Sequence, residues 1–497
     1  MTINFIVNDP LAVDAVPMRT KDPLPDRQGG QAGLSLMPGP PAGLFPPESP
    51  DFVFWQSREA ALTAIQTWES LNGLLSQWGP KTNNPAKLDL LWDAGDDLNA
   101  YYNRRSLSFF HHTTGTNTFY SGASTDVVAH ESGHAFLDAL RPELYNPSIT
   151  EHAAFHEAFG DCTAILTALS DQDTRVALLA LSPDLGSTNF VETLCEDLAN
   201  ATMAVLGPDW AGSEPRHALN NFKFQLPTTL PRSGSPAVLT SEFHSFGRIF
   251  SGCFYDMIRN MFQKAPVHDE AALLTVAQAA AKLLIAGVKN AEISPRFFQS
   301  VGRAIILADQ TRENHQAISD AFSGHGILLG SMSALMANAS LDGPAPRVRG
   351  TAKGLSLAPE TVKDIRKRIA APSGAKFMFQ TMALGSDDVV HAIHNREVPL
   401  DAISKDLRGV VAYAPEPIVV GGVRQDAALF SALPDASTTE DEVTAFVETL
   451  LANDDISFAS QKSGDTGQAR NAESVENFTH IIEKSGSKRV LTRIRYY

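Results

Sequence analysis

The sequence has few cysteines, an excess of acidic over basic side chains and no long uninterrupted apolar run. Its three cysteines, Cys162, Cys195 and Cys253, are scattered through 497 residues. They are too few for a disulfide framework and are typical of a protein in a reducing compartment. The formal net charge is −16. Because phosphate binding needs clustered cations, we expect no nucleic-acid partner.

Signals for membrane insertion and export are also missing. The longest apolar stretch, residues 273–288, is interrupted by Gln278 and Lys282 and is shorter than the roughly 20 apolar residues of a membrane span. The first residues, MTINFIVNDPL, have no basic start and only a short apolar run, which is not typical of a signal peptide. We therefore expect a cytoplasmic protein without a membrane span. Secretion without a leader would leave no mark in the sequence.

Composition indicates a soluble globular protein of several units. The chain has 43% hydrophobic and 19% charged residues, and its length predicts two or three domains. The first 50 residues hold ten of the 30 prolines, so we expect residues 1–50 to form an extended arm. Around residues 338–355 the composition shifts to Ala, Gly, Pro and Ser, which indicates a domain boundary. The predicted units are the arm, an N-terminal unit at 51–140, a helical unit at 141–335 and a C-terminal module at 345–497.

Apolar periodicity predicts both helices and strands. Helical spacing covers residues 57–75, 126–140, 155–169, 243–262, 270–287, 295–321, 360–370 and 439–453. Strand-like runs cover residues 87–92, 98–110, 376–382 and 409–423, and residues 480–497 are typical of a hairpin that turns at 485–487. The sequence therefore predicts an α+β fold, in which Asp126 or Thr125 caps the helix over 126–140.

One motif in the helix over 126–140 carries chemistry. His130-Glu131-Ser132-Gly133-His134 has the H-E-x-x-H pattern, and residues four apart on a helix share one face. Both imidazoles can therefore reach one Zn²⁺, and Glu131 can take a proton from water activated by the metal. Roughly 2 in 100 such chains show the pattern by chance, so the motif alone is only suggestive. A catalytic zinc site also needs a third protein ligand and an open fourth position.

The helix over 155–169 offers the third ligand. Glu157 follows His134 by 23 residues, and Asp161 lies four residues further on, on the same helix face. Together with H-E-x-x-H, this Glu-x-x-x-Asp pattern resembles the thermolysin-like gluzincin metallopeptidases. The resemblance implies that His130, His134 and Glu157 hold zinc and that Glu131 is the general base. It also implies that Asp161 orients His130.

Segments on both sides of the motif support the same resemblance. The run Asn99-Ala100-Tyr101-Tyr102-Asn103 is similar to the family's edge strand, which implies that Asn99 and Ala100 bind substrate backbone. Tyr145 follows His134 by 11 residues, where the family has a tyrosine that hydrogen-bonds the developing oxyanion. The resemblance therefore makes Tyr145 a candidate catalytic residue.

Two downstream residues complete the expected site. Arg216 and His244 are 28 residues apart, similar to the family's substrate-carbonyl arginine and transition-state histidine. The segment from His244 to Phe250 has the His-x-x-Gly-x-Ile-aromatic form of the fungalysin branch. The family's acidic partner, five residues before the histidine, is Leu239 here, and Glu242 is the only nearby substitute. Two other arginines are weaker alternatives to Arg216, namely Arg141 and Arg232.

Calcium and the third zinc ligand remain open at the level of sequence. Asp126 matches one calcium ligand of the family, whereas the other carboxylates of a calcium site cannot be placed in this sequence. Ca²⁺ is therefore an additional candidate cofactor beside Zn²⁺. Glu151 is the next candidate for the third zinc ligand if Glu157 does not bind the metal.

The resemblance covers about residues 85–325 and implies a two-lobed gluzincin fold. We expect an N-terminal lobe with a mainly antiparallel sheet, a helical C-terminal lobe, the zinc helix between them, and an additional α+β module at 345–497. The expected activity is zinc-dependent hydrolysis of peptide or protein substrates. An endopeptidase is favoured because the Gly-x-Met-Glu-Asn motif of aminopeptidase gluzincins is absent. The alternative is an effector or binding protein with a regulatory or degenerate peptidase core and recognition by the C-terminal module.

Overall fold

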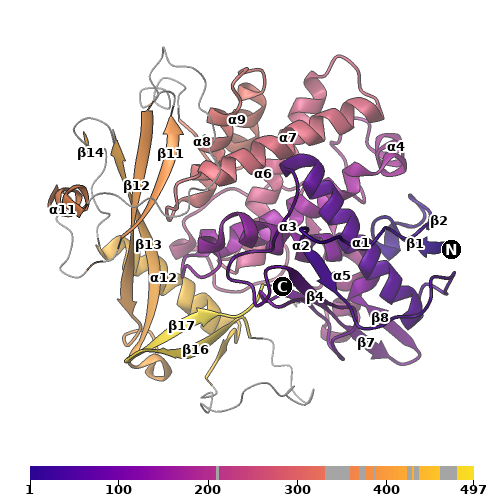
Figure 1. The fold of residues 1–497 in the computed structure, drawn as a ribbon, viewed down its shortest axis with the longest axis horizontal. Coiled ribbons are helices and arrows are strands. Elements are labelled where there is room, and N and C mark those ends of the chain that lie inside the picture. Colours follow the sequence, from indigo (N-terminus) through magenta and orange to yellow (C-terminus); the bar gives the residue numbers. More distant parts are fainter. Residues whose placement is uncertain are drawn as a thin grey trace.

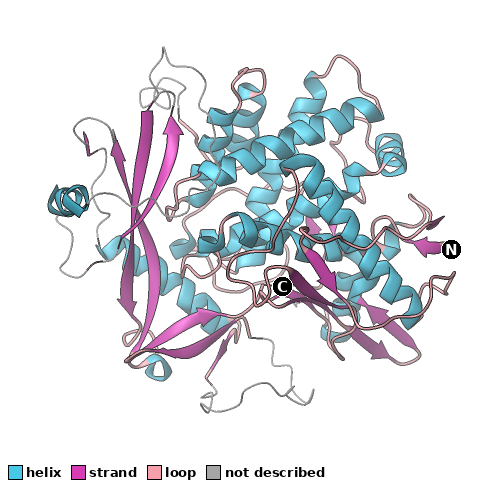
Figure 2. Ribbon diagram, in the orientation of Figure 1, coloured by secondary structure: helices cyan, strands magenta, loops and turns pink. Residues whose placement is uncertain are grey.

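A computed structural model describes residues 1–208, 212–330, 359–368, 375, 377–384, 387–421, 428–429, 436–458 and 478–496. The fold is α+β, as the sequence predicts. Helices fill the centre of the molecule and strands lie on two sides of them (Figure 2). The expected boundary at 338–355 lies outside the described residues.

A four-stranded sheet and one long helix make up most of the N-terminal unit. The strand order is β3 (Gly33–Ser35), β4 (Lys87–Leu91), β6 (Ser106–Phe109) and β5 (Ala100–Tyr102). Strands β3, β4 and β6 are parallel to one another, and β5 is antiparallel to β6. The prediction of a mainly antiparallel sheet is therefore wrong. The physical reason is that helix α1 (Pro50–Asn72) connects β3 to β4, and a crossover of this length places consecutive strands parallel.

Helix α1 has clear start and stop signals. The Ser49 side chain accepts a hydrogen bond from the Phe52 amide, and a proline occupies the first turn. The helix ends at Asn72, and the following residue, Gly73, has a φ of 82°, which suits a residue without Cβ. Its inner face packs on the next helix, where Trp68 stacks on Phe136 with ring centroids 4.9 Å apart.

The first 50 residues join this unit rather than forming a separate arm. Strand β1 (Ile3–Phe5) pairs with β2 (Arg19–Lys21), and β3 joins the four-stranded sheet. The buried side chain of Gln56 on α1 exchanges two hydrogen bonds with the backbone of Ile6, at 2.9 and 2.8 Å. These contacts tie the proline-rich segment to the core of the N-terminal unit.

Helices dominate residues 125–324. They are α2 (Thr125–Leu140), α3 (Thr150–Ser170), α4 (Gln172–Leu181), α5 (Glu196–Leu206), α6 (Phe243–Lys264), α7 (Glu270–Asn290), α8 (Phe297–Ala308) and α9 (His315–Gly324). The predicted helix over 295–321 is two helices, because the Asp309 carboxylate accepts a hydrogen bond from the Asn314 amide and Arg312 has a φ of 61°. Two short antiparallel pairs lie beside the helices: β7 (His111–Thr114) with β8 (Asn117–Tyr120), and β9 (Thr193–Leu194) with β10 (Arg216–His217).

Helix α7 is both long and apolar. Among the described residues it is the one helix that is long and apolar enough to cross a membrane, by length and composition alone. Half of its most apolar window is buried inside the fold, where it packs against α8 and α6. Leu273 and Val288 are fully buried there. This packing accounts for the apolar composition of α7.

The C-terminal module is built on a second, larger sheet. Its strand order is β11 (Phe377–Leu384), β12 (Asp387–Pro399), β13 (Val410–Gly421), β17 (Lys488–Arg493), β16 (His480–Ser485) and β15 (Ile456–Ser457), with β14 (Ala428–Leu429) paired to β13. Two helices belong to this part, α11 (Pro359–Arg368) and α12 (Ala436–Ala452). The predicted C-terminal hairpin is confirmed as β16 and β17. Strand β12 is not indicated by the sequence pattern.

The module packs on the helical unit through α12. Arg232 pairs with Glu448 at 2.7 Å, and the hydroxyls of Ser241 and Thr449 lie 2.6 Å apart. The Asn453 side chain donates to the Arg232 carbonyl at 3.0 Å. One continuous cluster of buried apolar side chains includes residues from both parts. The sheet therefore flanks the helices, with its long strands on the left in Figure 1.

Candidate metal centre

Helices α2 and α3 bring together the three predicted metal ligands. His130 and His134 lie one turn apart on α2, and Glu157 lies on α3. One ring nitrogen of each histidine and one Glu157 oxygen all lie within 4.8 Å of one another. All three side chains are buried. In the part of the chain that the structure describes, this is the one group of three His, Cys, Asp or Glu side chains placed to share a metal ion.

Two glycines allow the helices around the cluster to approach closely. A Cβ atom at Gly160 on α3 would lie 2.6 Å from Cε1 of His130. A Cβ atom at Gly247 on α6 would lie 2.8 Å from the Ala154 carbonyl oxygen and 3.2 Å from Cβ of Glu157. Since neither glycine has a Cβ, the His130 ring can rest on α3 and α6 can pack directly against Glu157.

The donor atoms of the cluster fit a metal ion. Within the described residues, His130 Nε2, His134 Nε2 and Glu157 Oε1 are buried and have no hydrogen-bond partner. Buried polar atoms without partners are rare and costly in folded proteins, and a shared cation would satisfy all three. Burial lowers the pKa of His134 to about 3, so this imidazole is neutral, which is the form that binds metals.

Asp161 and Arg216 hold the other nitrogen of the His130 ring. His130 Nδ1 lies 3.0 Å from Asp161 Oδ1, and Arg216 Nη2 lies 2.9 Å from the same oxygen. Burial alone would raise the pKa of Asp161, but Arg216 and His130 lower it to about 2. The structure thus places Asp161 beside His130, where the sequence predicts it. It brings Arg216 to Asp161, and a contact of Arg216 with a substrate carbonyl stays a prediction.

Glu131 lies beside the ligands with its carboxylate buried. Only 2% of the residue is exposed, and within the described residues Oε2 has no hydrogen-bond partner. Burial is the main cause that raises the pKa of Glu131 to about 8, and the nearby charge of Glu157 adds to it, whereas His130 opposes it. A carboxylate of this basicity can take up a proton near neutral pH.

His244 approaches the cluster from the first turn of α6. Its Nε2 lies 3.1 Å from Glu157 Oε2, and its Nδ1 lies 2.7 Å from Glu242 Oε1. Glu242 also caps α6 by accepting hydrogen bonds from the amides of His244 and Ser245. Burial would lower the pKa of His244, but Glu157 and Glu242 raise it well above its usual value. Glu242 therefore supplies the acidic partner that Leu239 cannot.

The remaining predicted residues lie in adjoining elements. Ala100 begins β5, at the edge of the four-stranded sheet, and Asn99 directly precedes it; both are buried. Tyr145 is buried after α2, with Arg104 stacked 3.8 Å from its ring centroid and the Tyr102 ring edge-on at 6.2 Å. The roles predicted for these residues toward a substrate stay predictions.

Sequence spacing does not predict that the rings of Tyr496 and His156 lie beside the candidate ligands. The Tyr496 ring stacks on His134 at 5.1 Å and on His156 at 4.0 Å between centroids. Its edge meets the Tyr145 ring at 5.2 Å. His156 is fully buried although it is adjacent to Glu157 in the sequence. No local pattern could place Tyr496 here, because more than 300 residues separate it from both helices.

In the part of the chain that it describes, the structure places no group of metal-binding side chains around Asp126, the expected calcium ligand. The Asp126 carboxylate accepts hydrogen bonds from the amides of Val127 and Cys195, at 2.6 and 2.8 Å. Burial raises the pKa values of Asp126 and of the neighbouring Asp9. Among the described residues, Asp126 does not belong to a group placed to hold a metal ion.

Glu151, the alternative third ligand, is committed elsewhere. It is fully buried on α3, where Arg296 donates to Oε1 at 2.9 Å and the Phe298 amide donates to Oε2 at 3.1 Å. Burial raises the pKa of this carboxyl group to about 7, although Arg296 opposes the shift.

The raised pKa of Glu151 predicts a specific pH dependence of stability. The folded state binds the proton more tightly than the unfolded state, so the group favours folding below pH 4.5 and loses this contribution as the pH rises through about 7. We expect the free energy of unfolding of wild type, relative to Glu151→Gln, to fall by about 3 kcal/mol between pH 4 and pH 8, at about 1.4 kcal/mol per pKa unit. Urea unfolding of both proteins across this range measures the difference. Parallel pH profiles for the two proteins would contradict the expected shift.

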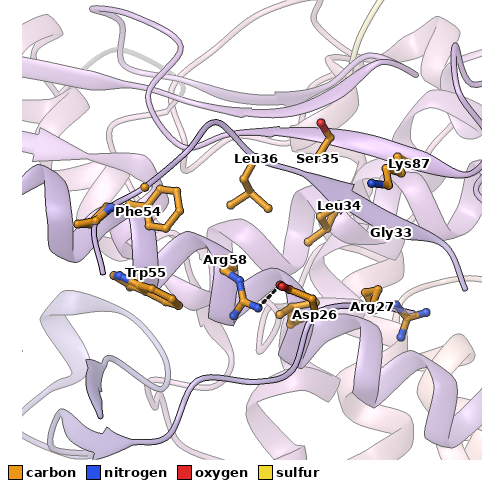
Figure 3. Close-up of a pocket in the computed structure, with 13 residues that line it drawn as sticks. Asp26, Arg27, Gly33, Leu34, Ser35, Leu36, Phe54, Trp55, Arg58 and Lys87 are labelled. Carbon is orange, nitrogen blue, oxygen red and sulfur yellow. Dashed lines mark hydrogen bonds and ion pairs between the residues drawn. The ribbon is translucent and has the colours of Figure 1, made fainter. Parts of the chain in front are cut away.

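A cavity of about 510 Å³ lies beside β3 and α1 and is separate from the metal cluster. Figure 3 shows Phe54, Trp55 and Arg58 of α1 on one side and Leu34 of β3 on the other. The Arg58 guanidinium is paired with Asp26 at 2.7 Å. No residue of the metal cluster lines this cavity.

No known protein family and no curated protein matches this chain. Fold and site alone therefore define its class. It is an α+β protein with a buried centre of two histidines and one glutamate that can hold a metal ion.

Proposed function

We propose that the protein is a zinc-dependent metalloendopeptidase of the gluzincin kind. The observation that carries the proposal is the convergence of His130, His134 and Glu157 with the buried carboxylate of Glu131. Two imidazoles and one carboxylate are the ligands of catalytic zinc sites that keep a fourth position open. In this proposal the N-terminal unit and the helices after α2 are the two lobes of the enzyme.

The positions of the side chains support a specific reaction. Zinc at this site would supply a Lewis acid that polarises the scissile carbonyl and lowers the pKa of a water molecule. Glu131 takes a proton from the attacking water and returns it to the leaving amine. His244, held by Glu242, donates to the oxygen that becomes negative in the transition state. Asp161 keeps the His130 ring in place.

Strand β5 gives the substrate a place to bind. It lies at the edge of the four-stranded sheet, and an extended peptide can add to such an edge through backbone hydrogen bonds. Helix α2 packs against β5, so a strand added there would run beside the zinc helix. This arrangement supports peptides or unfolded protein segments as substrates.

Metal analysis and a proteolysis assay test the proposal together. Purified protein should contain about one zinc ion per chain, as a single three-ligand site requires. A chelator should abolish cleavage of an unfolded protein substrate, and added Zn²⁺ should restore it. Active protein that contains no zinc would exclude the proposal, and zinc-loaded protein without hydrolysis would favour the effector or binding protein described above.

A further inference from the structure

The edge of β5 is already paired with a segment of the same chain. Tyr102 on β5 and Tyr496 form an antiparallel bridge. The Tyr102 amide donates to the Tyr496 carbonyl, and the Tyr496 amide donates to the Tyr102 carbonyl, both at 2.9 Å. Two residues that exchange both backbone hydrogen bonds form a hydrogen-bonded pair, as in an antiparallel sheet. Tyr496 therefore occupies part of the edge that a substrate strand would need.

The Tyr496 side chain fills the space between this edge and the metal ligands. Its ring lies against His134 and His156, as described above, and only 1% of the residue is exposed. Its hydroxyl donates to the Tyr145 carbonyl at 3.0 Å. A buried aromatic ring held by stacking and by one hydrogen bond is a specific contact rather than loose surface packing.

Two buried arginines contact this segment and its surroundings. The Arg493 guanidinium lies 4.1 Å from the centroid of the Tyr496 ring. The Arg495 side chain donates to the Phe478 carbonyl at 2.6 Å and lies over the Tyr101 ring. Strand β17 belongs to the sheet of the C-terminal module, and the chain continues from it toward the N-terminal sheet, near β4 in Figure 1. Tyr496, a residue of the C-terminal module, thus lies beside the candidate metal centre.

We propose that residues 494–496 are a built-in inhibitory strand, which places Tyr496 against Tyr102 in the substrate groove along β5. The inference rests on the proposed peptidase function, because it assigns this groove to substrate. The proposal also makes the space that the Tyr496 ring fills, beside His134 and His156, a subsite for an aromatic side chain of the substrate. Activity then requires Tyr496 to leave, and substrates that present an aromatic residue in an extended strand compete with it best.

The expected strength of inhibition follows from tethering. A tethered segment has an effective concentration on the order of 1 mM. If the free segment bound with a dissociation constant of about 100 μM, the tethered form would leave the groove open in roughly one molecule in ten. Removing the anchor should therefore raise activity at low substrate concentration by about tenfold.

The test compares Tyr496→Ala with wild type in two measurements. The first is hydrogen–deuterium exchange of residues 100–104 in metal-free protein, where we expect loss of protection of the β5 edge. The second is hydrolysis of an unfolded protein by the zinc-loaded forms, where we expect the tenfold rise. The acetylated and amidated peptide of residues 493–496 should inhibit the variant in trans, and the same peptide with alanine in place of tyrosine should not.

Three further variants serve as controls. Tyr496→Phe keeps the ring and loses only the bond to the Tyr145 carbonyl, so it should stay close to wild type. Arg495→Ala loosens the same segment without changing Tyr496, so it should shift both measurements in the same direction. It serves as the test if Tyr496→Ala does not fold. Phe458→Ala removes an exposed aromatic side chain of the module and should change neither.

The two measurements separate the inference from the proposed function. Faster exchange at β5 without hydrolysis in any form would support the inhibitory strand as the occupant of a binding groove and overturn the peptidase. Unchanged exchange and unchanged hydrolysis in both Tyr496→Ala and Arg495→Ala would overturn the inhibitory strand while the peptidase stands.

Discussion

Glu131→Gln should lower kcat on the order of 10²- to 10⁴-fold, the usual contribution of a general acid–base group. The amide is nearly isosteric with the carboxylate but can neither accept nor return the proton. Glu131 is buried, adjoins His130 in the sequence and is not itself one of the three grouped ligands. The measurement is kcat on a peptide substrate together with zinc content, which should remain that of wild type.

A variant on the same helix separates this effect from damage to α2. Ser132 is buried and donates to the Val128 carbonyl at 2.8 Å, within its own helix. Ser132→Ala should therefore keep both zinc and activity. Both substitutions should also be made in Tyr496→Ala, where the groove is expected to be open. A fully active Glu131→Gln enzyme with zinc bound would transfer the role of base to another group, and His244 would be the first to examine.

Local periodicity predicts the helices well, because it depends on neighbours within a few turns. The zinc helix is expected over 126–140 and begins one residue earlier. Helix α3 begins at Thr150 rather than at residue 155. The earlier start is not predicted because the first turn is buried and includes the polar side chains of Glu151 and His152. An amphipathic pattern does not indicate a helix that is buried on all sides.

Strand direction is a non-local property, and the sequence prediction failed there. Residues 98–110 alternate as strand-like residues, but the chain reverses at Arg104, which has a φ of 65°, and yields β5 and β6. The direction of β3 against β4 depends on how α1 crosses the sheet, which no spacing within either strand records.

Helix geometry predicts that His130 and His134 share one face of α2, whereas Glu157 and Asp161 are indicated by the resemblance to gluzincins. Residues four apart on α2 share a face, and Glu157 with Asp161 repeats that spacing on α3. Tyr496 could not be predicted, since more than 300 residues of sequence separate it from His134 and no local pattern records their contact. The contact between Glu242 and His244 lies between these cases, because it needs only the first turn of α6.

Glu157→Ala should reduce zinc affinity on the order of 10²- to 10³-fold. Zinc sites with four ligands have binding free energies of about 10–16 kcal/mol, so one ligand contributes about a quarter of this. A tenfold change in affinity corresponds to about 1.4 kcal/mol. Asp161→Asn should weaken affinity less, by about 10- to 100-fold, since Asp161 acts through the His130 ring. Glu151→Gln, on the same helix but bound to Arg296, should keep the affinity of wild type. Competition titration with a chromophoric chelator measures all three. The graded order separates a ligand from a residue that positions a ligand, and wild-type affinity in Glu157→Ala together with zinc loss in Glu151→Gln would make Glu151 the third ligand instead.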